Sequence, residues 1–209
     1  MELGTKITID WSADGRFLLY LSLDPQSDLD LWVLPLDGEG KPVVFLKTNF
    51  VEYAGGFSPD GRWVAYQSNE SGRFEIYVRP FVAPATGGTA GAAAGGAAGG
   101  ATANGAGGQW QVSTAGGISP RWGPDGRELY YLGPDGQMMA APVAVAGATP
   151  VPGTPVKLFD TRIYGGGVDN RLLWQYDVSR DGRFLINTVL DEAAAPITLI
   201  QHWQPDVTR

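Results

Sequence analysis

The amino-acid sequence predicts an all-β protein, a β-propeller of about four blades with four antiparallel strands each. A pattern that contains Asp-Gly-Arg occurs four times along the chain. The turn glycines of successive copies lie 46, 65 and 56 residues apart, and the second spacing falls to 40 once the low-complexity residues 83–107 are set aside. Repeats of roughly 40–50 residues made of short strands are typical of propellers. No long segment combines helical periodicity with helix caps. These observations predict an essentially helix-free fold.

Each copy of the pattern predicts a tight hairpin. The copies are WSADGRFLLY from Trp11, FSPDGRWVAY from Phe57, WGPDGRELYY from Trp122 and VSRDGRFLIN from Val178. Asp-Gly between two apolar runs is a strong hairpin signal, because glycine adopts a positive φ without a Cβ clash. We therefore expect every repeat to begin with a strand, turn at its glycine and return along a second strand. The turn glycines are Gly15, Gly61, Gly126 and Gly182.

The strands of each repeat follow in order. The expected return strands are residues 17–22, 63–68, 128–132 and 183–189. The expected third strands are residues 29–36, 74–81, 137–143 and 196–203. Three of these carry a proline one residue before their end, namely Pro35, Pro80 and Pro142, and proline belongs at a strand end or edge. The expected fourth strands are residues 42–47, 109–113 and 155–159, and the last repeat ends before it can form one.

The blades predicted from these strands span residues 6–48, 52–114, 117–160 and 172–204 of a single propeller over 1–209. Residues 83–108 form an Ala/Gly-rich tract within the second blade. Such residues have almost no side chain to bury, and each glycine costs a helix about 1 kcal/mol relative to alanine. We expect a flexible loop insertion there. Four blades with the last incomplete predict an open partial propeller.

Composition excludes several classes of function. The formal net charge is −7, from 15 basic and 22 acidic residues, which argues against a nucleic-acid partner. The chain contains no cysteine, so disulfides and thiolate metal sites are absent. The N-terminal sequence MELGTKITIDWS lacks the pattern of a signal peptide, and no apolar run is long enough to span a bilayer. The chain alone does not reveal its compartment.

The repeat FSPDGRWVAYQSNESGRFEIYVRPF, residues 57–81, resembles the WD-like propeller repeats of the TolB type. It is most similar to the extracytoplasmic propeller at the C-terminus of bacterial membrane-bound serine/threonine protein kinases, as is the last repeat, residues 176–203. The resemblance implies a non-catalytic binding or sensing module in the periplasm or outside the cell. The alternatives are an accessory propeller of a prolyl-oligopeptidase-like serine peptidase and a TolB-like periplasmic transport scaffold.

No catalytic, cofactor or metal site is predicted. Kinase motifs are absent, and the only histidine, His202, lies in the tail without a nucleophile motif. The carboxylates of Asp24, Asp28 and Asp30 miss the spacing of a calcium loop and are interpreted as a solvated turn. The arginines of the four turns are interpreted as structural, with aspartates that cap turn amides.

The candidate ligand-binding residues are Asp10, Arg121 and Asp177. Each stands just before a turn, on the innermost strand of its repeat, at a matching position. They are therefore expected near the central channel, where they either bind a ligand or pair with one another. The partner is an unidentified protein or small molecule. Unpaired blade edges also predict self-association.

Overall fold

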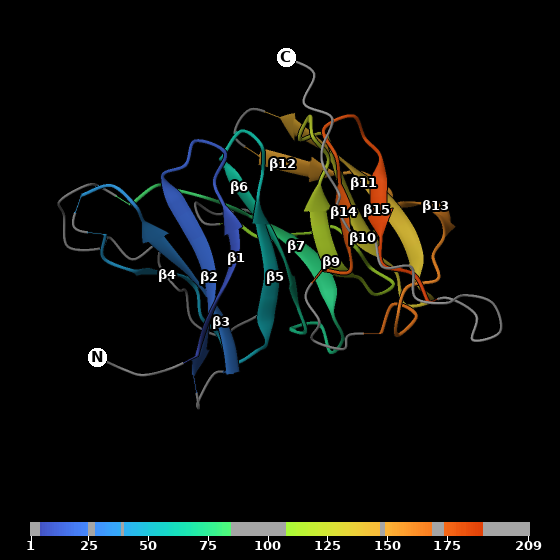
Figure 1. Cartoon of the computed structure of the whole chain (residues 1–209), viewed down its shortest axis with the longest axis horizontal. Coiled ribbons are helices and arrows are strands. Elements are labelled where there is room, and N and C mark those ends of the chain that lie inside the picture. The colour runs from blue at the N-terminus through green and yellow to red at the C-terminus, as the bar shows by residue number, and fades with distance from the viewer. Residues whose placement is uncertain are drawn as a thin grey trace, which may run out of the picture.

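The computed structural model describes residues 5–24, 28–38, 40–84, 108–146, 149–168 and 174–189. These residues form strands and turns without a helix, so the predicted all-β class is confirmed (Figure 1). Consequently, none of the described segments could cross a membrane as a helix. The tail with the expected strand at 196–203 and His202, and most of the Ala/Gly tract, lie outside the described residues.

The first two blades have four antiparallel strands each, in sequence order. Blade 1 consists of β1 (Lys6–Trp11), β2 (Phe17–Asp24), β3 (Asp28–Pro35) and β4 (Val43–Leu46). Blade 2 consists of β5 (Glu52–Phe57), β6 (Trp63–Ser68), β7 (Glu75–Pro80) and β8 (Trp110–Gln111). Strand β8 is shorter than the predicted 109–113.

The third and fourth blades depart from the four-strand plan. Blade 3 consists of β9 (Ile118–Trp122), β10 (Glu128–Leu132), β11 (Gln137–Ala146), β12 (Thr149–Pro152) and β13 (Val156–Asp160). The described part of blade 4 consists of β14 (Tyr176–Val178) and β15 (Phe184–Ile186), with one further bridge between Ile163 and Thr188. Strand β15 is shorter than the predicted 183–189.

One strand end was predicted wrongly. Pro35 and Pro80 do end β3 and β7, but β11 continues past Pro142 to Ala146. Pro142 is the last residue of β11 that faces β10, opposite Glu128. The four residues beyond it pair with β12, which the sequence did not predict because its TPVP segment contains two prolines.

The Asp-Gly turns form as predicted. Gly15, Gly61, Gly126 and Gly182 all have φ between 68° and 80°. In the first two turns the aspartate accepts hydrogen bonds from the serine two residues before it and from the arginine backbone N–H two residues after it. That serine also accepts a hydrogen bond from the first residue of the return strand, so one Ser-x-Asp unit closes the hairpin.

Adjacent blades pack face to face. One core, with Leu19, Leu31 and Tyr66, lies between blades 1 and 2. A second, with Trp63 and Leu129, lies between blades 2 and 3, and a third joins blades 3 and 4. All six residues of β6 are buried because blade 2 is covered on both faces. The inner strands β1, β5, β9 and β14 consequently lie in a row across an open arc (Figure 1).

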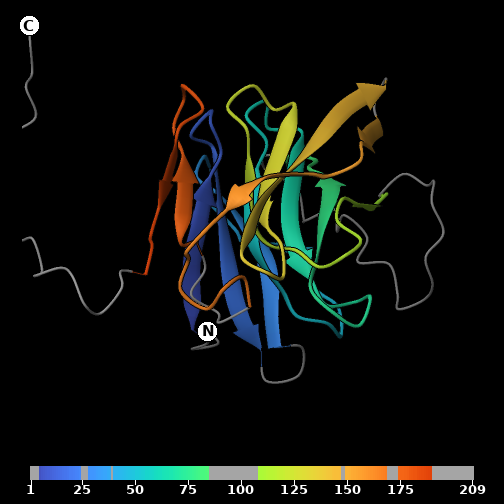
Figure 2. The same cartoon turned by 90° about the vertical axis from the view of Figure 1, so that its right-hand side faces the viewer.

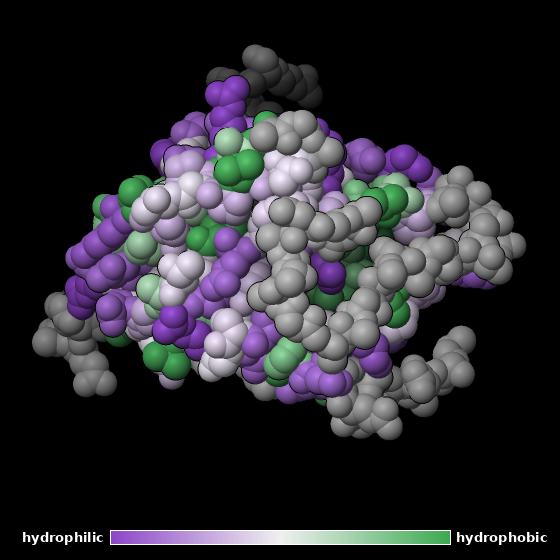
Figure 3. Space-filling view, turned by 180° about the vertical axis from the view of Figure 1, so that it is seen from behind, coloured by the Kyte–Doolittle hydropathy of each residue, from purple (hydrophilic) through white to green (hydrophobic). Residues whose placement is uncertain are grey.

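The outer surface mixes apolar and polar residues. Seen from behind, hydrophobic residues form small patches separated by hydrophilic ones (Figure 3). Exposed apolar side chains include Val82 and Leu185. Scattered exposed apolar residues are normal for a folded surface and do not by themselves mark an interface.

Candidate functional site

The inner strands of the four blades carry four matching positions, Asp10, Gly56, Arg121 and Asp177, each followed by the last residue of its strand. In β1, β5 and β9, the strand pairing is irregular within a few residues before this position. Such bulges bend a strand and redirect the side chains that follow. The fold thus places three charged groups and one glycine on neighbouring strands.

Arg121 and Asp177 lie together. Nε of Arg121 is 3.7 Å from Oδ1 of Asp177, and the two side chains are 24% and 68% exposed. The guanidinium also lies 4.2 Å from the ring centroid of Trp174, a cation–π contact. Trp174 is held in place by its indole N–H, which donates to the carbonyl of Pro120 over 3.2 Å. One arginine therefore contacts both a carboxylate and an aromatic face from blade 4.

Asp10 belongs to the same electrostatic environment. Its Oδ2 accepts a 2.7 Å hydrogen bond from the backbone N–H of Phe57, which ties blade 1 to blade 2. Burial raises the pKa of Asp10, hydrogen bonds and the charge of Arg121 lower it, and the charge of Asp177 raises it. The structure thus brings Asp10, Arg121 and Asp177 together, with pairing between the last two. We call these residues and Trp174 the inner-strand cluster.

Further hydrogen bonds hold the backbone around the cluster. The indole N–H of Trp122 donates to the carbonyl of Gly56 over 3.2 Å, and the hydroxyl of Tyr176 donates to the carbonyl of Ser119 over 2.8 Å. Burial raises the pKa of Tyr176 far above its usual value, so this hydroxyl keeps its proton. Both hydrogen bonds connect neighbouring blades beside the cluster.

Sequence reasoning missed Trp174. It stands three residues before Asp177, as Ile118 stands before Arg121, so the repeat marks an apolar position. The repeat could not show that the indole ring would lie against the guanidinium. Nε of Arg121 is buried, yet it has no hydrogen-bond partner among the described residues. A buried donor without a partner in the protein calls for one from solvent or from a ligand.

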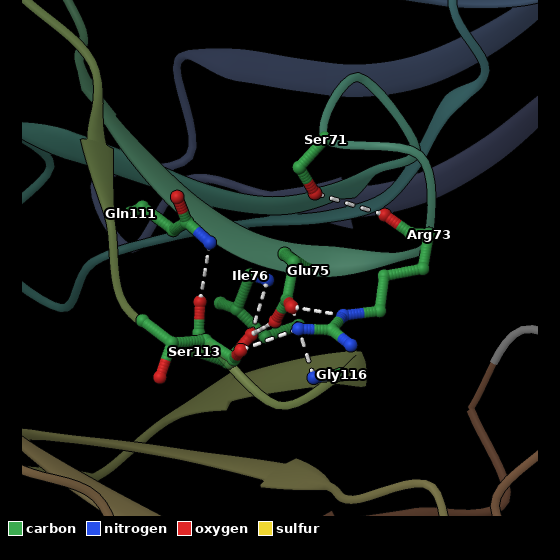
Figure 4. A network of polar contacts seen from close by, with 8 residues as sticks. Ser71, Arg73, Glu75, Ile76, Gln111, Ser113 and Gly116 are labelled. Atoms are coloured by element: carbon green, nitrogen blue, oxygen red, sulfur yellow. Dashed lines mark hydrogen bonds and ion pairs between the residues drawn. The ribbon is translucent and has the colours of Figure 1, made fainter. Parts of the chain in front are cut away.

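A second polar network lies at the passage from blade 2 to blade 3 (Figure 4). The carboxylate of Glu75, 1% exposed, accepts hydrogen bonds from Nε of Arg73 over 2.7 Å, from the N–H of Gly116 over 2.9 Å and from the hydroxyl of Ser113. Ser113 also accepts a hydrogen bond from the N–H of Ile76. Every group has a partner within the protein, which identifies this network as structural rather than as a reaction site.

The interpretation of Asp24, Asp28 and Asp30 as a solvated turn is wrong for Asp30. This residue lies within β3, is fully buried and has Nζ of Lys47 3.5 Å from its carboxylate. No metal-binding group of three or more His, Cys, Asp or Glu residues occurs in the described ranges. The turn arginines pair with nearby carboxylates: Arg16 with Asp37, Arg62 with Asp60 and Arg183 with Asp181. These pairs support the interpretation that the arginines stabilise turns.

Comparison with known proteins identifies the fold. No family model and no curated protein matches the sequence. Among solved structures, the chain is similar to TolB from Acinetobacter baumannii, with 15% identity and a TM-score of 0.55 over 88% of this chain. A putative TolB from Agrobacterium tumefaciens has 21% identity and a TM-score of 0.34, over 78% of this chain and 64% of that one. The chain spans 37% of the Acinetobacter TolB chain, and at this identity the likeness establishes the propeller fold alone.

Proposed function

We propose that this chain is a non-catalytic binding module and that the inner-strand cluster is its ligand site. The observation that carries the proposal is the environment of Arg121, which lies between the ring of Trp174 and the carboxylate of Asp177 with a buried Nε that has no acceptor among the described residues. A ligand oxygen, from a carbonyl or carboxylate, would supply that acceptor.

The ligand must also tolerate negative charge. Asp177 is 68% exposed beside the arginine, and Asp10 adds a second carboxylate whose pKa is raised by burial. A protein segment could meet both requirements. Its acceptor oxygen would bind Arg121, and a neighbouring polar or cationic group would face the carboxylates of Asp10 and Asp177. We infer that the partner is a protein, in agreement with the scaffold role implied by the TolB-type resemblance.

Two settings for this module follow from resemblance. The repeats resemble the propellers of membrane serine/threonine kinases, which would place the module outside the cytoplasm as a sensor domain. The Acinetobacter structure with a similar fold is a TolB protein, which favours a TolB-like periplasmic scaffold. The flanking genomic DNA tests the first setting, because an upstream kinase domain and membrane helix would support it. A downstream hydrolase domain would instead support a third setting, an accessory propeller of a peptidase.

The test is affinity capture from an extract of the source organism with three forms of the full chain. Arg121→Ala removes the cluster cation, and Arg16→Ala removes a turn arginine outside the cluster. We expect a defined set of bound proteins to be lost with Arg121→Ala and kept by Arg16→Ala. Circular dichroism checks that both variants are folded. If both then capture the same set of proteins, the cluster is not the binding site.

A further inference from the structure

Strand β11 extends beyond the sheet to which it belongs. Up to Pro142 it pairs with β10, and from Val143 to Ala146 it pairs only with β12. In Figure 2 this two-stranded ribbon projects from the body of the arc. Val143 lies in the core between blades 2 and 3, whereas Val145 is 40% exposed. The ribbon is therefore anchored at its base and open toward its end.

On the β11 edge of the ribbon, the side away from β12, the backbone groups of Val145 have no neighbouring strand to pair with among the described strands. The N–H of Val143 donates to the carbonyl of Arg127 over 2.7 Å, so it points away from β12. Residues two apart in a strand direct their backbone groups to the same side. The N–H and C=O of Val145 therefore point the same way, where β10 has already ended opposite Pro142. Val145 thus presents a donor and an acceptor at an open strand edge.

The opposite edge of the ribbon is protected. Pro150 and Pro152 of β12 lie opposite Val145 and Val143, so their backbone nitrogens point outward by the same parity. Proline has no N–H, and proteins commonly use it to prevent strand addition at an edge. Of the two edges of the ribbon, the β11 edge therefore offers a further strand both an N–H donor and a C=O acceptor, whereas the β12 edge lacks the donors at its prolines.

A groove of about 670 Å³ lies along the open edge. Its walls are residues 142–145 of the ribbon, the blade 2 turn with Pro59 and Arg62, and the blade 3 turn with Asp125 and Arg127. The two arginines are balanced by Asp60 and Asp125, and Arg62 is paired with Asp60 at 2.6 Å. The groove is electrically balanced, although the whole chain has a net charge of −7.

We propose that this groove binds an extended, uncharged peptide segment of a partner protein, which adds as a strand to the β11 edge at Val145. Strand addition takes its affinity from main-chain hydrogen bonds and its selectivity from alternate side chains. Here the side chains would contact Pro59 and Val145, and the balanced walls match a segment without net charge. This site is separate from the inner-strand cluster and does not depend on the function proposed for it.

The probe is the peptide acetyl-Thr-Val-Thr-Val-Thr-amide, titrated into the isotopically labelled full chain and followed by NMR. We expect saturable shifts at Val145 and at the two turns, and slower amide exchange at Val145. The same peptide N-methylated at all five residues has no backbone N–H to donate on either edge and should not bind. Binding of both peptides alike, shifts confined to the inner-strand cluster, or no shift at millimolar peptide would overturn the proposal.

Two substitutions of Val145 distinguish the contribution of its backbone N–H to peptide binding from that of its side chain. Val145→Pro removes the groove-facing N–H without touching a β12 hydrogen bond, and should weaken peptide binding about tenfold or more. Val145→Thr keeps the N–H and should bind within about threefold of the natural chain. Equal affinities for the two variants would contradict strand addition. Shifts at Val145 that depend on protein concentration in the absence of peptide would show that the edge pairs with a second copy of this chain. That outcome would contradict the proposed peptide partner.

Discussion

The carboxylate of Asp10 and the backbone N–H of Phe57 are joined by a 2.7 Å hydrogen bond that connects the inner strands of blades 1 and 2. The bond is made beside Gly56, where a Cβ would lie 3.6 Å from Oδ2 of Asp10. The same carboxylate contributes to the inner-strand cluster. Asp10 therefore combines a structural contact with its place in the proposed ligand site.

Removing this carboxylate should destabilise the arc. Asp10→Ala leaves the N–H of Phe57 without its acceptor, at a cost of about 1–3 kcal/mol in the free energy of unfolding. Asp10→Asn retains an oxygen that can accept the bond and should recover most of the loss. Urea denaturation of the three forms measures the difference. An Ala variant as stable as the natural chain would show that the bond contributes nothing.

Glu52 should make stability depend on pH. Its side chain is fully buried at the start of β5. Burial first, and then the nearby charges of Asp30 and Glu70, raise its pKa to about 7, although the hydrogen bond from the Thr48 hydroxyl lowers it. A raised pKa means that the folded state holds the proton more tightly than the unfolded state. This contribution is complete below about pH 4.5 and is lost as pH rises through about 7.

Glu52→Gln should therefore stabilise the protein at pH 8, by on the order of 2–3 kcal/mol, and have little effect near pH 4. The measurement is the free energy of unfolding by urea at both pH values. The control is Asp135→Asn, which changes an exposed carboxylate and should shift neither value. A constant difference between Glu52→Gln and the natural chain across this range would contradict the assigned pKa.

The Glu75 network should be the costliest polar group to disturb. Glu75→Ala leaves three donors, from Arg73, Ser113 and Gly116, without their acceptor. Arg73 is 60% exposed and can turn to water, so the cost comes from the donors of Ser113 and Gly116, at about 1–3 kcal/mol for a buried donor without a partner. The exposed pair Arg16–Asp37 is the comparison, since Arg16→Ala should cost at most about 1 kcal/mol. Thermal and urea unfolding rank the two variants. Equal losses would mean that solvent reaches Glu75 in the folded protein.

The sequence predicted the parts of the fold that depend on local chemistry. Gly15 and its three counterparts required a positive φ, and Ser12 with Asp14 supplied the hydrogen bonds of the turn, so the hairpins could be located from the chain alone. The extension of β11 could not be located in this way. Its partner TPVP has a composition typical of a loop, and it forms a strand because its two prolines occupy alternate positions. Local signals do not report which edge of a strand remains open.

The inner-strand cluster was predicted in the same partial way. Repeat alignment placed Asp10, Arg121 and Asp177 at one strand position, and the structure brings them together. The contact between Trp174 and Arg121 joins two blades, so it depends on packing between repeats, which no single repeat encodes. Ligand binding by these residues is the function proposed above, and the capture experiment with Arg121→Ala tests it.

The last prediction concerns the outer face of blade 1. Tyr20 and Trp32 stack there with centroids 6.4 Å apart, and Trp11 and Val44, which face the same side, are 60% and 36% exposed. In the described part of the chain no sheet packs on this face, whereas both faces of blade 2 are covered. Tyr20, in the middle of the face, is only 6% exposed, so the exposed apolar surface lies at Trp11 and Val44. Propellers bury such faces against a neighbouring blade, and aromatic side chains dominate the energetics of interfaces.

We expect the purified chain to self-associate through this face. Trp11→Glu together with Val44→Lys adds a charge of each sign at exposed positions and should shift the molecular mass toward the monomer without loss of fold. Multi-angle light scattering over a range of concentrations measures the mass, and Val82→Lys, also at an exposed apolar residue, is the control. A monodisperse monomer of the natural chain at every concentration would contradict self-association, and an unchanged assembly in the double variant would place the contact on another surface.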